Sequence, residues 1–319
     1  MRGAKSMFSN LNAYTKLPDG SFQDNEGNFV FFSFDRFKNE ICKQGHCFVC
    51  GSPPNNGFNK EHVFPNWLLR HCRMHNEELT LPNGERIKYG TYKIPCCKSC
   101  NTKLAEVYEK PISKAICGGY DDLVAFLQNG GANLLHFWLS LIFTKVHLRD
   151  FQNRAHLDLR EKDEKVGEFY DLHDLHHIHA IARASMANVH VEDDVFGTLN
   201  IFPKTHSDKD STFDYCDNLM GRGLLLHIKD IAFVYIVDDC GATASMLSDR
   251  LAVLPERLSK IQLREIYARH LAANIHIKES PKFSSGRNSC VAMSKPTSIP
   301  TIPKITVAMA KYLTILLSY

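Results

Sequence analysis

The sequence predicts an α+β fold, in which a small cysteine-bearing module precedes a larger domain of mixed helix and strand. Two Cys-x-x-Cys pairs enclose a strand-like segment near the N-terminus. Helical periodicity then dominates over 107–183, and strand-like alternation follows over about 185–240. We therefore expect an N-terminal extension at 1–40, a module at 41–110 and a mixed domain at 111–319.

The composition is that of a soluble globular protein, with 44% hydrophobic and 23% charged residues. The first residues contain no apolar run of the kind found in a secretory signal, so we expect a cytoplasmic protein. The most apolar stretch, 305–319, is too short for a bilayer span and is interrupted by Lys311. It predicts a buried terminal helix or strand, and no membrane association is expected.

The extension should fold locally before the first cysteine pair. The segment around Glu26-Gly27 predicts a β-hairpin, because glycine beside acidic and amide residues favours a tight turn. A helix is expected after this hairpin, and it should run into the first cysteine pair.

Four of the eleven cysteines are spaced as metal ligands. Cys47-x-x-Cys50 and Cys97-x-x-Cys100 form the pattern of a four-cysteine zinc site, because each tight turn presents two thiolates on one edge of a tetrahedron. A disulfide framework is not expected in a cytosolic protein. We therefore predict a structural zinc ion.

Two neighbouring residues bear on this site. Gly51 follows the first pair, where a Cβ would crowd the turn. Cys96 can replace Cys97 with a different turn, so both stay candidates. The remaining cysteines are scattered and are expected to be buried small apolar residues, namely Cys42, Cys72, Cys117, Cys216, Cys240 and Cys290.

The segment between the two pairs contains Glu61-His62 in the sequence NKEHVFP. It predicts a short strand, in which alternation places Glu61 and His62 on opposite faces and Pro65 ends the pairing. A helix should begin just after the second cysteine pair, and its first turn would place the Asn101 amide near the strand end. Taken alone, Glu61-His62 favours a surface strand pair with an internal hydrogen bond, and only the flanking cysteine pairs favour a catalytic site.

The order CxxCG, Glu-His-x-x-Pro and CxxCN over about residues 40–110 resembles the zinc-stapled branch of the HNH endonucleases, the ββα-metal nucleases. The resemblance implies a treble-clef-like ββα-metal module in which His62 is the general base. Glu61 and Asn101 would bind one catalytic divalent ion, Mg²⁺ or Mn²⁺, which suits oxygen ligands and a phosphate. The zinc ion would then be structural and would not contact the substrate.

Two positions depart from the family pattern. Many members have Asp where this chain has Glu61, whose longer side chain can still reach a metal ion. The middle Asn of the family usually lies a few residues before the third cysteine, where this chain has Tyr92. Asn83 is the nearest asparagine and lies in a predicted turn, so the residue that steadies the catalytic loop is unassigned.

Basic residues are concentrated in the module. Between residues 41 and 105, nine Lys/Arg stand against four Glu, a local excess of +5 that exceeds the +3 of the whole chain. This excess suits a phosphate-binding surface, although a solvated face with ordinary lysines has the same composition. Lys60, Lys98 and Lys103 flank the proposed site and are the candidate DNA contacts.

The larger domain should contain a core helix at 134–150, whose apolar residues cover so much of its circumference that it must be buried. A hairpin is expected to turn near Lys229-Asp230, and an amphipathic helix should occupy 255–275. The Ser/Pro/Lys-rich stretch 279–304 predicts a linker or loop.

Four histidines, His173, His176, His177 and His179, lie close together in a predicted helix, and three of them are spaced to share one face. A second metal site and a solvated, pH-sensitive face are the two interpretations. The second is favoured, because no Cys-x-x-Cys pair or Glu-rich segment lies nearby.

Two classes of function follow. In the first, the protein is a metal-dependent endonuclease that hydrolyses DNA phosphodiester bonds, and Glu61, His62 and Asn101 favour this class. In the second, favoured by Tyr92, the module is a non-catalytic zinc finger that binds nucleic acid or a partner. A nuclease joined to a larger domain is similar to the HNH enzymes of bacterial restriction and anti-phage systems. By that analogy, 111–319 would recognise DNA, a signal ligand or a second protein.

Overall fold

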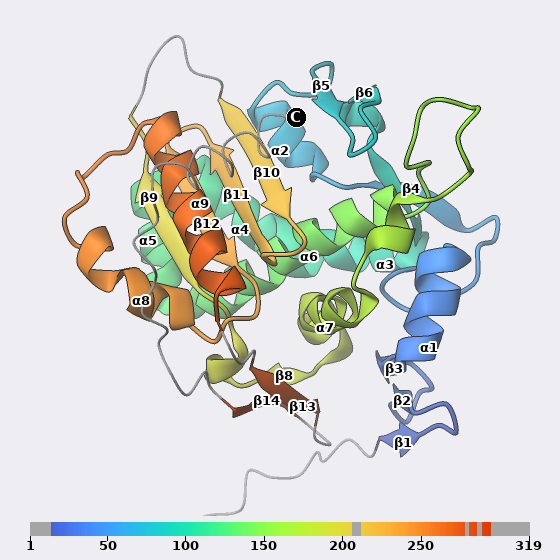
Figure 1. Cartoon of the computed structure of the whole chain (residues 1–319). Coiled ribbons are helices and arrows are strands. Elements are labelled where there is room, and N and C mark those ends of the chain that lie inside the picture. The colour runs from blue at the N-terminus through green and yellow to red at the C-terminus, as the bar shows by residue number, and fades with distance from the viewer. Residues whose placement is uncertain (1–13, 206–211, 278–280, 286–288, 295–319) are drawn as a thin grey trace, which may run out of the picture.

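The computed structural model describes residues 14–205, 212–277, 281–285 and 289–294. Helices and strands are mixed along the chain, so the predicted α+β class is confirmed. A long helix, α6 (Ala132–Asp150), crosses the middle of the molecule (Figure 1). The cysteine-bearing module and the largest sheet both pack against this helix, through Lys145 with Glu61 and through Ser140 with Tyr235.

Helix α6 is buried because of its composition. Every residue from Phe137 to Leu148 is buried. A helix that is apolar on all faces must be covered on all sides, so the predicted core helix is confirmed. The buried run includes Lys145, a charge that requires a partner in the interior.

The N-terminal segment forms a small sheet followed by a helix. Its strands are β1 (Thr15–Lys16), β2 (Phe22–Gln23) and β3 (Phe29–Phe31), paired in the order β1-β2-β3. The turn between β2 and β3 contains Gly27 at a φ of +81°, which glycine adopts without strain. The predicted hairpin is therefore confirmed. The chain continues through α1 (Phe34–Arg36) and the wide helical turn η1 (Phe37–Lys43) into the first cysteine pair.

The module places two antiparallel strands next to a helix. Strand β4 (Phe58–His62) pairs with β7 (Lys93–Cys97), and α3 (Lys98–Leu104) follows β7 without a break. The predicted strand at Glu61-His62 is confirmed, whereas the helix begins earlier than expected, within the second cysteine pair. Between the two strands lie α2 (Asn66–His71), β5 (Glu78–Thr80), β6 (Arg86–Lys88) and η2 (Tyr89–Thr91).

Helical segments continue from α3 across residue 110. They are η3 (Ala105–Glu109), α4 (Lys110–Cys117), α5 (Tyr120–Phe126) and η4 (Leu127–Gly131), and after α6 come η5 (Val166–Phe169), α7 (Leu172–Arg183) and η6 (Ala184–Ala187). The buried core also crosses this position. The ring centroid of Phe64 lies 5.6 Å from that of Phe213 and 4.8 Å from that of Tyr215. The division of the chain at residue 110 stays a prediction.

The largest sheet has four antiparallel strands in the order β10-β11-β12-β9. The strands are β9 (Leu199–Pro203), β10 (Phe213–Asn218), β11 (Gly223–Ile228) and β12 (Ile231–Ile236). The register pairs Ile228 with Ile231, so the predicted hairpin turn at Lys229-Asp230 is confirmed.

Both faces of this sheet are covered. Toward α6, the hydroxyl oxygens of Tyr235 and Ser140 lie 3.0 Å apart. The other face packs against α9 (Lys260–Ile275), beside which lies α8 (Ala242–Leu251) (Figure 1). The predicted helix at 255–275 is therefore confirmed, with a later start after the capping residue Ser259.

The stretch expected to be a linker contains two strands. Strands β13 (Lys282–Ser285) and β14 (Ser289–Ser294) form a sheet with β8 (His190–Val191), and the turn η7 (Asp193–Val195) follows β8. The linker prediction is wrong for these strands. Residues 295–319, with the apolar stretch 305–319, lie outside the described residues. Among the described helices, none combines the length and the apolar character that crossing a membrane requires.

Candidate functional site

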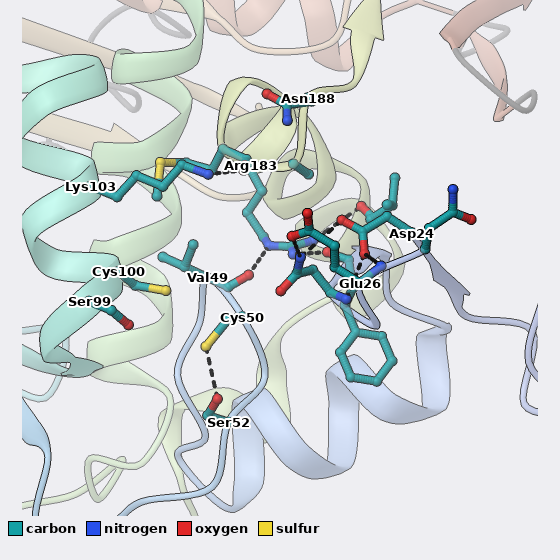
Figure 2. A pocket seen from close by; sticks show the side chains of 16 residues that line it. Asp24, Glu26, Val49, Cys50, Ser52, Ser99, Cys100, Lys103, Arg183 and Asn188 are labelled. Carbon is teal, nitrogen blue, oxygen red and sulfur yellow. Dashed lines mark hydrogen bonds between the residues drawn. The ribbon is translucent and has the colours of Figure 1, made fainter. Parts of the chain in front are cut away.

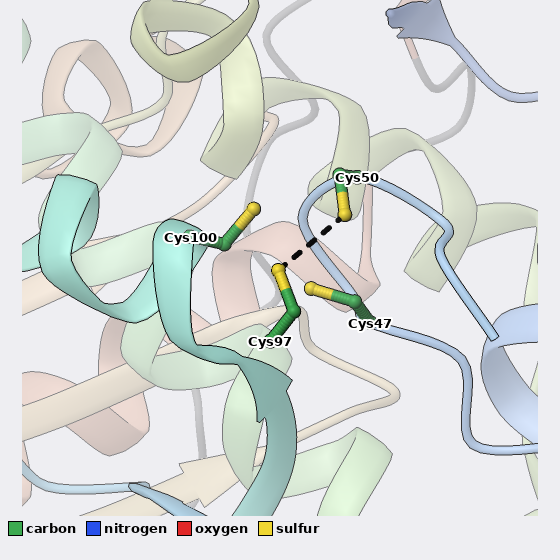
Figure 3. Close-up of side chains that lie close together, drawn as sticks. All are labelled: Cys47, Cys50, Cys97 and Cys100. Atoms are coloured by element: carbon green, nitrogen blue, oxygen red, sulfur yellow. Dashed lines mark hydrogen bonds between the residues drawn. The ribbon is translucent and has the colours of Figure 1, made fainter. Parts of the chain in front are cut away.

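Four cysteine sulfurs converge where the first cysteine turn meets the start of α3 (Figure 3). Cys47 and Cys50 come from that turn, Cys97 from the end of β7 and Cys100 from the first turn of α3. The four Sγ atoms lie within 4.8 Å of one another, and those of Cys50 and Cys97 are 3.7 Å apart. Four sulfurs around zinc at about 2.3 Å form a tetrahedron with edges of about 3.8 Å. The cluster therefore fits a metal ion such as zinc.

Cys96 lies beside this cluster but outside it. Its side chain is fully buried, and its Sγ atom lies 3.8 Å from that of Cys47. It alternates with Cys97 along β7 and so points to the opposite face of the strand. Hydrogen bonding to Cys47 raises the pKa of Cys96, whereas the sulfurs of Cys100, Cys50 and Cys96 lower the pKa of Cys47. The geometry selects Cys97 for the cluster and leaves Cys96 as a neutral thiol next to Cys47.

Gly51 and Arg183 fix the first cysteine turn. Gly51 has a φ of +75°, and a Cβ there would lie 2.7 Å from Phe32 Cε1, so the predicted need for glycine is confirmed. Arg183 donates from Nε to the Val49 carbonyl at 2.6 Å and from Nη2 to the Phe29 carbonyl at 2.8 Å. Burial lowers the pKa of Arg183 to about 10, and the nearby thiolates favour its charged form. Arg183 thus ties the turn to the N-terminal sheet and offsets thiolate charge.

The histidines of α7 hold the same region through backbone carbonyls. The Nε2 atom of His176 lies 2.8 Å from the Phe32 carbonyl oxygen, and that of His179 lies 2.6 Å from the Phe48 carbonyl oxygen. Burial lowers the pKa of His177 to about 4 and that of His179 well below its usual value. The solvated-face interpretation is therefore wrong for His176 and His179, whereas His173 is exposed as that interpretation expects. In the described part of the chain, they belong to no group that can hold a metal ion.

Glu61 is half of a buried ion pair. In the β4–β7 register Glu61 stands opposite Ile94 and His62 opposite Lys93, so Glu61 and His62 lie on opposite faces, as predicted. The Nζ atom of Lys145 lies 3.0 Å from Glu61 Oε1 and also donates to the His62 carbonyl at 2.8 Å. The side chains of Lys145 and Glu61 are 1% and 8% exposed. Lys145 was not among the predicted site residues, although a lone lysine in an apolar helix signals a buried partner.

Asn101 contacts the face of β4 that carries Glu61. Its Nδ2 atom donates to Asn59 Oδ1 at 3.0 Å. Asn59 precedes Glu61 by two residues, which places both side chains on one face of the strand. The first turn of α3 therefore lies against the face of β4 that carries Glu61. Because the hydrogen bond to Asn59 uses the Asn101 Nδ2 atom, the Asn101 Oδ1 atom can act as an acceptor or a metal ligand. His62 occupies the opposite face.

A second carboxyl group, that of Glu109 at the end of η3, lies near enough to the Glu61–Lys145 pair for both charges to affect its pKa. Desolvation raises the pKa of Glu109 to about 7, the charge of Lys145 opposes this shift, and the charge of Glu61 adds to it. Glu109 lies outside the motif and was not predicted. The Glu109 carboxyl group therefore gains and loses its proton near neutral pH. It does so near Glu61, which the motif resemblance makes a metal ligand.

His62 is half-buried, and its environment favours the neutral ring. Burial is the largest cause that lowers the pKa of His62 from the ordinary 6.5, and the charge of Lys93 lowers it further, while Glu61 opposes the shift. The ring of His75 lies 6.1 Å away, edge-on. A neutral imidazole that is partly open to solvent has the protonation state that a general base requires at neutral pH.

The three lysines predicted to contact DNA lie on two different elements. Lys60 is exposed on β4, on the same face as His62. Lys98 and Lys103 are exposed on α3, and Lys103 Nζ donates to the Met186 carbonyl at 2.9 Å. Lys103 also lines a cavity of about 570 Å³ beside the cysteine cluster (Figure 2). Their role in DNA binding stays a prediction.

A core residue, Tyr92, stands where the motif resemblance would place the middle Asn. Tyr92 is 1% exposed, and its hydroxyl donates to a backbone carbonyl of α6 at 3.3 Å. The carbonyl of Tyr92 accepts from the Val63 N–H at 3.0 Å, which steadies the segment directly after His62. Asn83, in the turn between β5 and β6, donates instead to the Arg154 carbonyl at 2.9 Å.

Strands β4 and β7, helix α3 and the cysteine cluster form one compact unit of this chain. No protein-family model, curated protein or solved structure matches the chain. The function is therefore inferred from the arrangement of Glu61, His62 and Asn101 around the strand pair.

We expect Lys145→Met to lower the free energy of unfolding by about 3–5 kcal/mol, because it leaves the buried Glu61 carboxylate without its cation. Chemical denaturation measures this loss. Lys110→Met is the matched control, because the side chain of Lys110 is 73% exposed and its surface pair with Glu106 contributes at most about 1 kcal/mol. Adding Glu61→Gln to Lys145→Met should restore part of the stability. Wild-type stability in Lys145→Met would contradict the buried pair.

Proposed function

We propose that this protein is a metal-dependent endonuclease of the HNH type, which hydrolyses DNA phosphodiester bonds. One observation supports the proposal above the others. Strand β4, strand β7 and helix α3 form a unit with four converging cysteines, and Glu61, His62 and Asn101 surround its strand pair. This order of strand, strand and helix agrees with the ββα-metal module that the motif resemblance implies. In this proposal the four cysteines bind a structural zinc ion.

His62 supplies the general base. A water molecule attacks phosphorus, a new P–O bond forms, and the P–O bond to the leaving sugar oxygen breaks. The proton released by the water passes to the imidazole. A pKa below 6.5 leaves this ring unprotonated at neutral pH. The hydrogen bond from Lys145 to the His62 carbonyl, at 2.8 Å, holds the strand end that carries the ring.

Glu61 and Asn101 are the residues that would hold a divalent ion. Carboxylate and amide oxygens suit Mg²⁺ or Mn²⁺, and both side chains face the same side of β4. Such an ion supplies, when bound, stabilisation of the charge that develops on the phosphate. Because Lys145 lies 3.0 Å from Glu61 Oε1, this carboxylate would be shared between the lysine and the ion.

The same ion pair favours one alternative function. Lys145 satisfies the charge of Glu61 without a metal ion, and Tyr92 lies in the core where the family has Asn. In this alternative, the zinc-bearing module binds nucleic acid or a partner without cutting it.

Incubation of the zinc-loaded protein with supercoiled plasmid separates the two functions. We expect nicked or linear DNA with Mg²⁺ or Mn²⁺, and intact plasmid when neither is added, because the zinc ion is structural. Glu61→Gln keeps an acceptor for Lys145 but weakens the metal site, so its cleavage should be low and partly recovered by more Mg²⁺. DNA binding without cleavage at any metal concentration would favour the binding module.

The motif analogy also supplies a proposal for the cellular role. Nucleases of this type joined to a larger domain act in bacterial restriction and anti-phage defence, so residues 111–319 would recognise DNA, a signal ligand or a second protein. This part of the proposal rests on the analogy and not on a site in the larger domain.

A further inference from the structure

A second cavity, with a volume of about 360 Å³, lies beside the strand pair. Its lining includes Lys60 and Lys93 from the face that carries His62, and Ile94 from the face that carries Glu61. Its cationic side chains are Lys60 from β4, Lys93 from β7 and Arg149 from α6. Among the described residues that line it, none is Asp or Glu. We name it the basic recess and define it by these three residues. Its charge distinguishes it from the cavity beside the cysteine cluster.

The basic recess adjoins the proposed base. Lys93 stands directly opposite His62 in the β4–β7 register, and Lys60 precedes His62 by two residues on the same face. Directly opposed residues of an antiparallel pair have Cβ atoms about 4.5–5.5 Å apart, and residues two apart along a strand are separated by about 7 Å. Both ammonium groups can therefore act on a ligand that contacts His62.

The two lysines of the recess have no acidic partner among the described residues. Within the described part of the chain, the ammonium groups of Lys60 and Lys93 have no hydrogen bond or ion pair. Arg149 Nη1 donates to the neutral Asn153 Oδ1 at 2.8 Å, and its Cζ atom lies 5.8 Å from the centroid of the Tyr92 ring. Burial raises the pKa of the neighbouring Asp150 carboxyl group, and the charge of Arg149 acts on this group to lower it. Three cations around one recess, two of them lysines without a charged partner among the described residues, raise the local concentration of anions and favour a phosphate ligand.

His46 also lines the recess but is not counted among its cations. Its Nδ1 atom lies 2.9 Å from the Gly51 carbonyl oxygen and 3.8 Å from a carboxylate oxygen of Glu40. These contacts turn the ring toward the first cysteine turn, so His46 contributes to the structure of the wall.

The cavity beside the cysteine cluster does not fit the same ligand. Asp24 and Glu26 line it together with Arg183 and Lys103 (Figure 2). Carboxylates repel a phosphate, and the Arg183 donors already bind the carbonyls of the cysteine turn and the N-terminal sheet. Of these two cavities, only the basic recess combines unpaired lysines with the absence of lining carboxylates among the described residues.

We infer that the basic recess binds a phosphate group of the DNA strand next to the scissile bond. The position of the scissile phosphate rests on the proposed nuclease function, whereas binding in the recess does not require cleavage. The inference adds Lys93 and Arg149 to the DNA surface. It also places the strand across β4, β7 and α6, away from the α3 lysines.

Fluorescence anisotropy with a labelled DNA duplex, in buffer without Mg²⁺ or Mn²⁺, tests this inference on the zinc-loaded protein. Lys93→Gln/Arg149→Gln should weaken binding by roughly tenfold or more at low salt. It should also reduce the slope of log affinity against log salt by about 2, close to one for each lost phosphate contact. Lys93→Arg should keep the wild-type slope. Lys110→Gln/Lys114→Gln is the matched two-charge control on exposed positions of α4.

Zinc content and circular dichroism establish that the variants are folded. An unchanged salt slope in folded Lys93→Gln/Arg149→Gln would overturn the inference, and a slope lowered only by Lys98→Gln/Lys103→Gln would place the DNA on α3. If the recess variant loses binding but the wild type never cuts, the recess stands and the nuclease proposal fails. If the wild type cleaves DNA but the recess variant keeps the wild-type salt slope, the nuclease proposal stands and the recess inference fails.

Discussion

Cys97→Ser is expected to reduce the zinc content of the purified protein from about one ion per chain to a small fraction of that value. Structural zinc contributes about 10–16 kcal/mol of apparent binding free energy in small zinc domains, and loss of one of four thiolates removes much of it. Because Cys97 stands where β7 ends and α3 begins, the helix should also lose its attachment to the strand pair. Elemental analysis after dialysis against a weak chelator measures the zinc, and denaturation measures the stability.

Two serine variants control for this experiment. Cys96→Ser changes the neighbouring thiol on the opposite face of β7 and retains a donor toward Cys47, so it should keep the zinc ion. Cys117→Ser changes an exposed cysteine and should have no effect. Loss of zinc from Cys96→Ser with retention in Cys97→Ser would reverse the ligand assignment. A wild-type protein without bound metal would remove the metal centre altogether.

The cysteine cluster was predictable because its determinants are local. Each Cys-x-x-Cys turn sets the position of two sulfurs, and strand alternation at Glu61-His62 follows from sequence spacing alone. The partner of Glu61 was not predictable in the same way. Lys145 is 84 residues away in the sequence, and only the packing of α6 against the strand pair brings the two charges together. A lysine within an apolar run indicates that a partner exists, but not which one.

The same distinction applies to the rest of the fold. Helix α6 and the β11–β12 hairpin were predictable from their long apolar runs, because elements that are buried on all sides leave such runs in the sequence. Strands β13 and β14 were missed, although they pair with each other as neighbours in the sequence, because a Ser/Pro/Lys-rich composition favours a loop. The further pairing of β14 with β8 joins segments that are distant in the sequence. The imidazoles of His176 and His179 were misread for a related reason, since their partners are backbone carbonyls that no side-chain pattern reveals.

His62→Ala is expected to reduce DNA cleavage by roughly two to four decades, the usual contribution of a positioned general base. Fold, zinc content and DNA affinity should stay near those of the wild type. The variant keeps the backbone carbonyl that Lys145 binds, so the end of β4 retains its support. His75→Ala removes the neighbouring ring, whose centroid lies 6.1 Å away, and should retain most of the cleavage.

Metal dependence separates the base from the proposed metal ligands. Glu61→Gln and Asn101→Ala weaken the divalent site, so a higher Mg²⁺ concentration should recover part of their lost rate. No metal concentration replaces a missing base, and His62→Ala should stay inactive throughout such a titration. Cleavage of plasmid at increasing Mg²⁺, with equal zinc content in all variants, measures the difference.

The pH dependence of cleavage provides the second signature of His62. Protonation removes the base, so the rate should fall with decreasing pH through the folded pKa of His62, which burial and Lys93 hold below 6.5. Lys93→Gln removes a positive charge that disfavours the imidazolium ion. It should therefore raise this pKa and move the loss of rate to higher pH. Wild-type cleavage by His62→Ala, with contaminating nuclease excluded, would place the base elsewhere and make the HNH mechanism wrong for this protein.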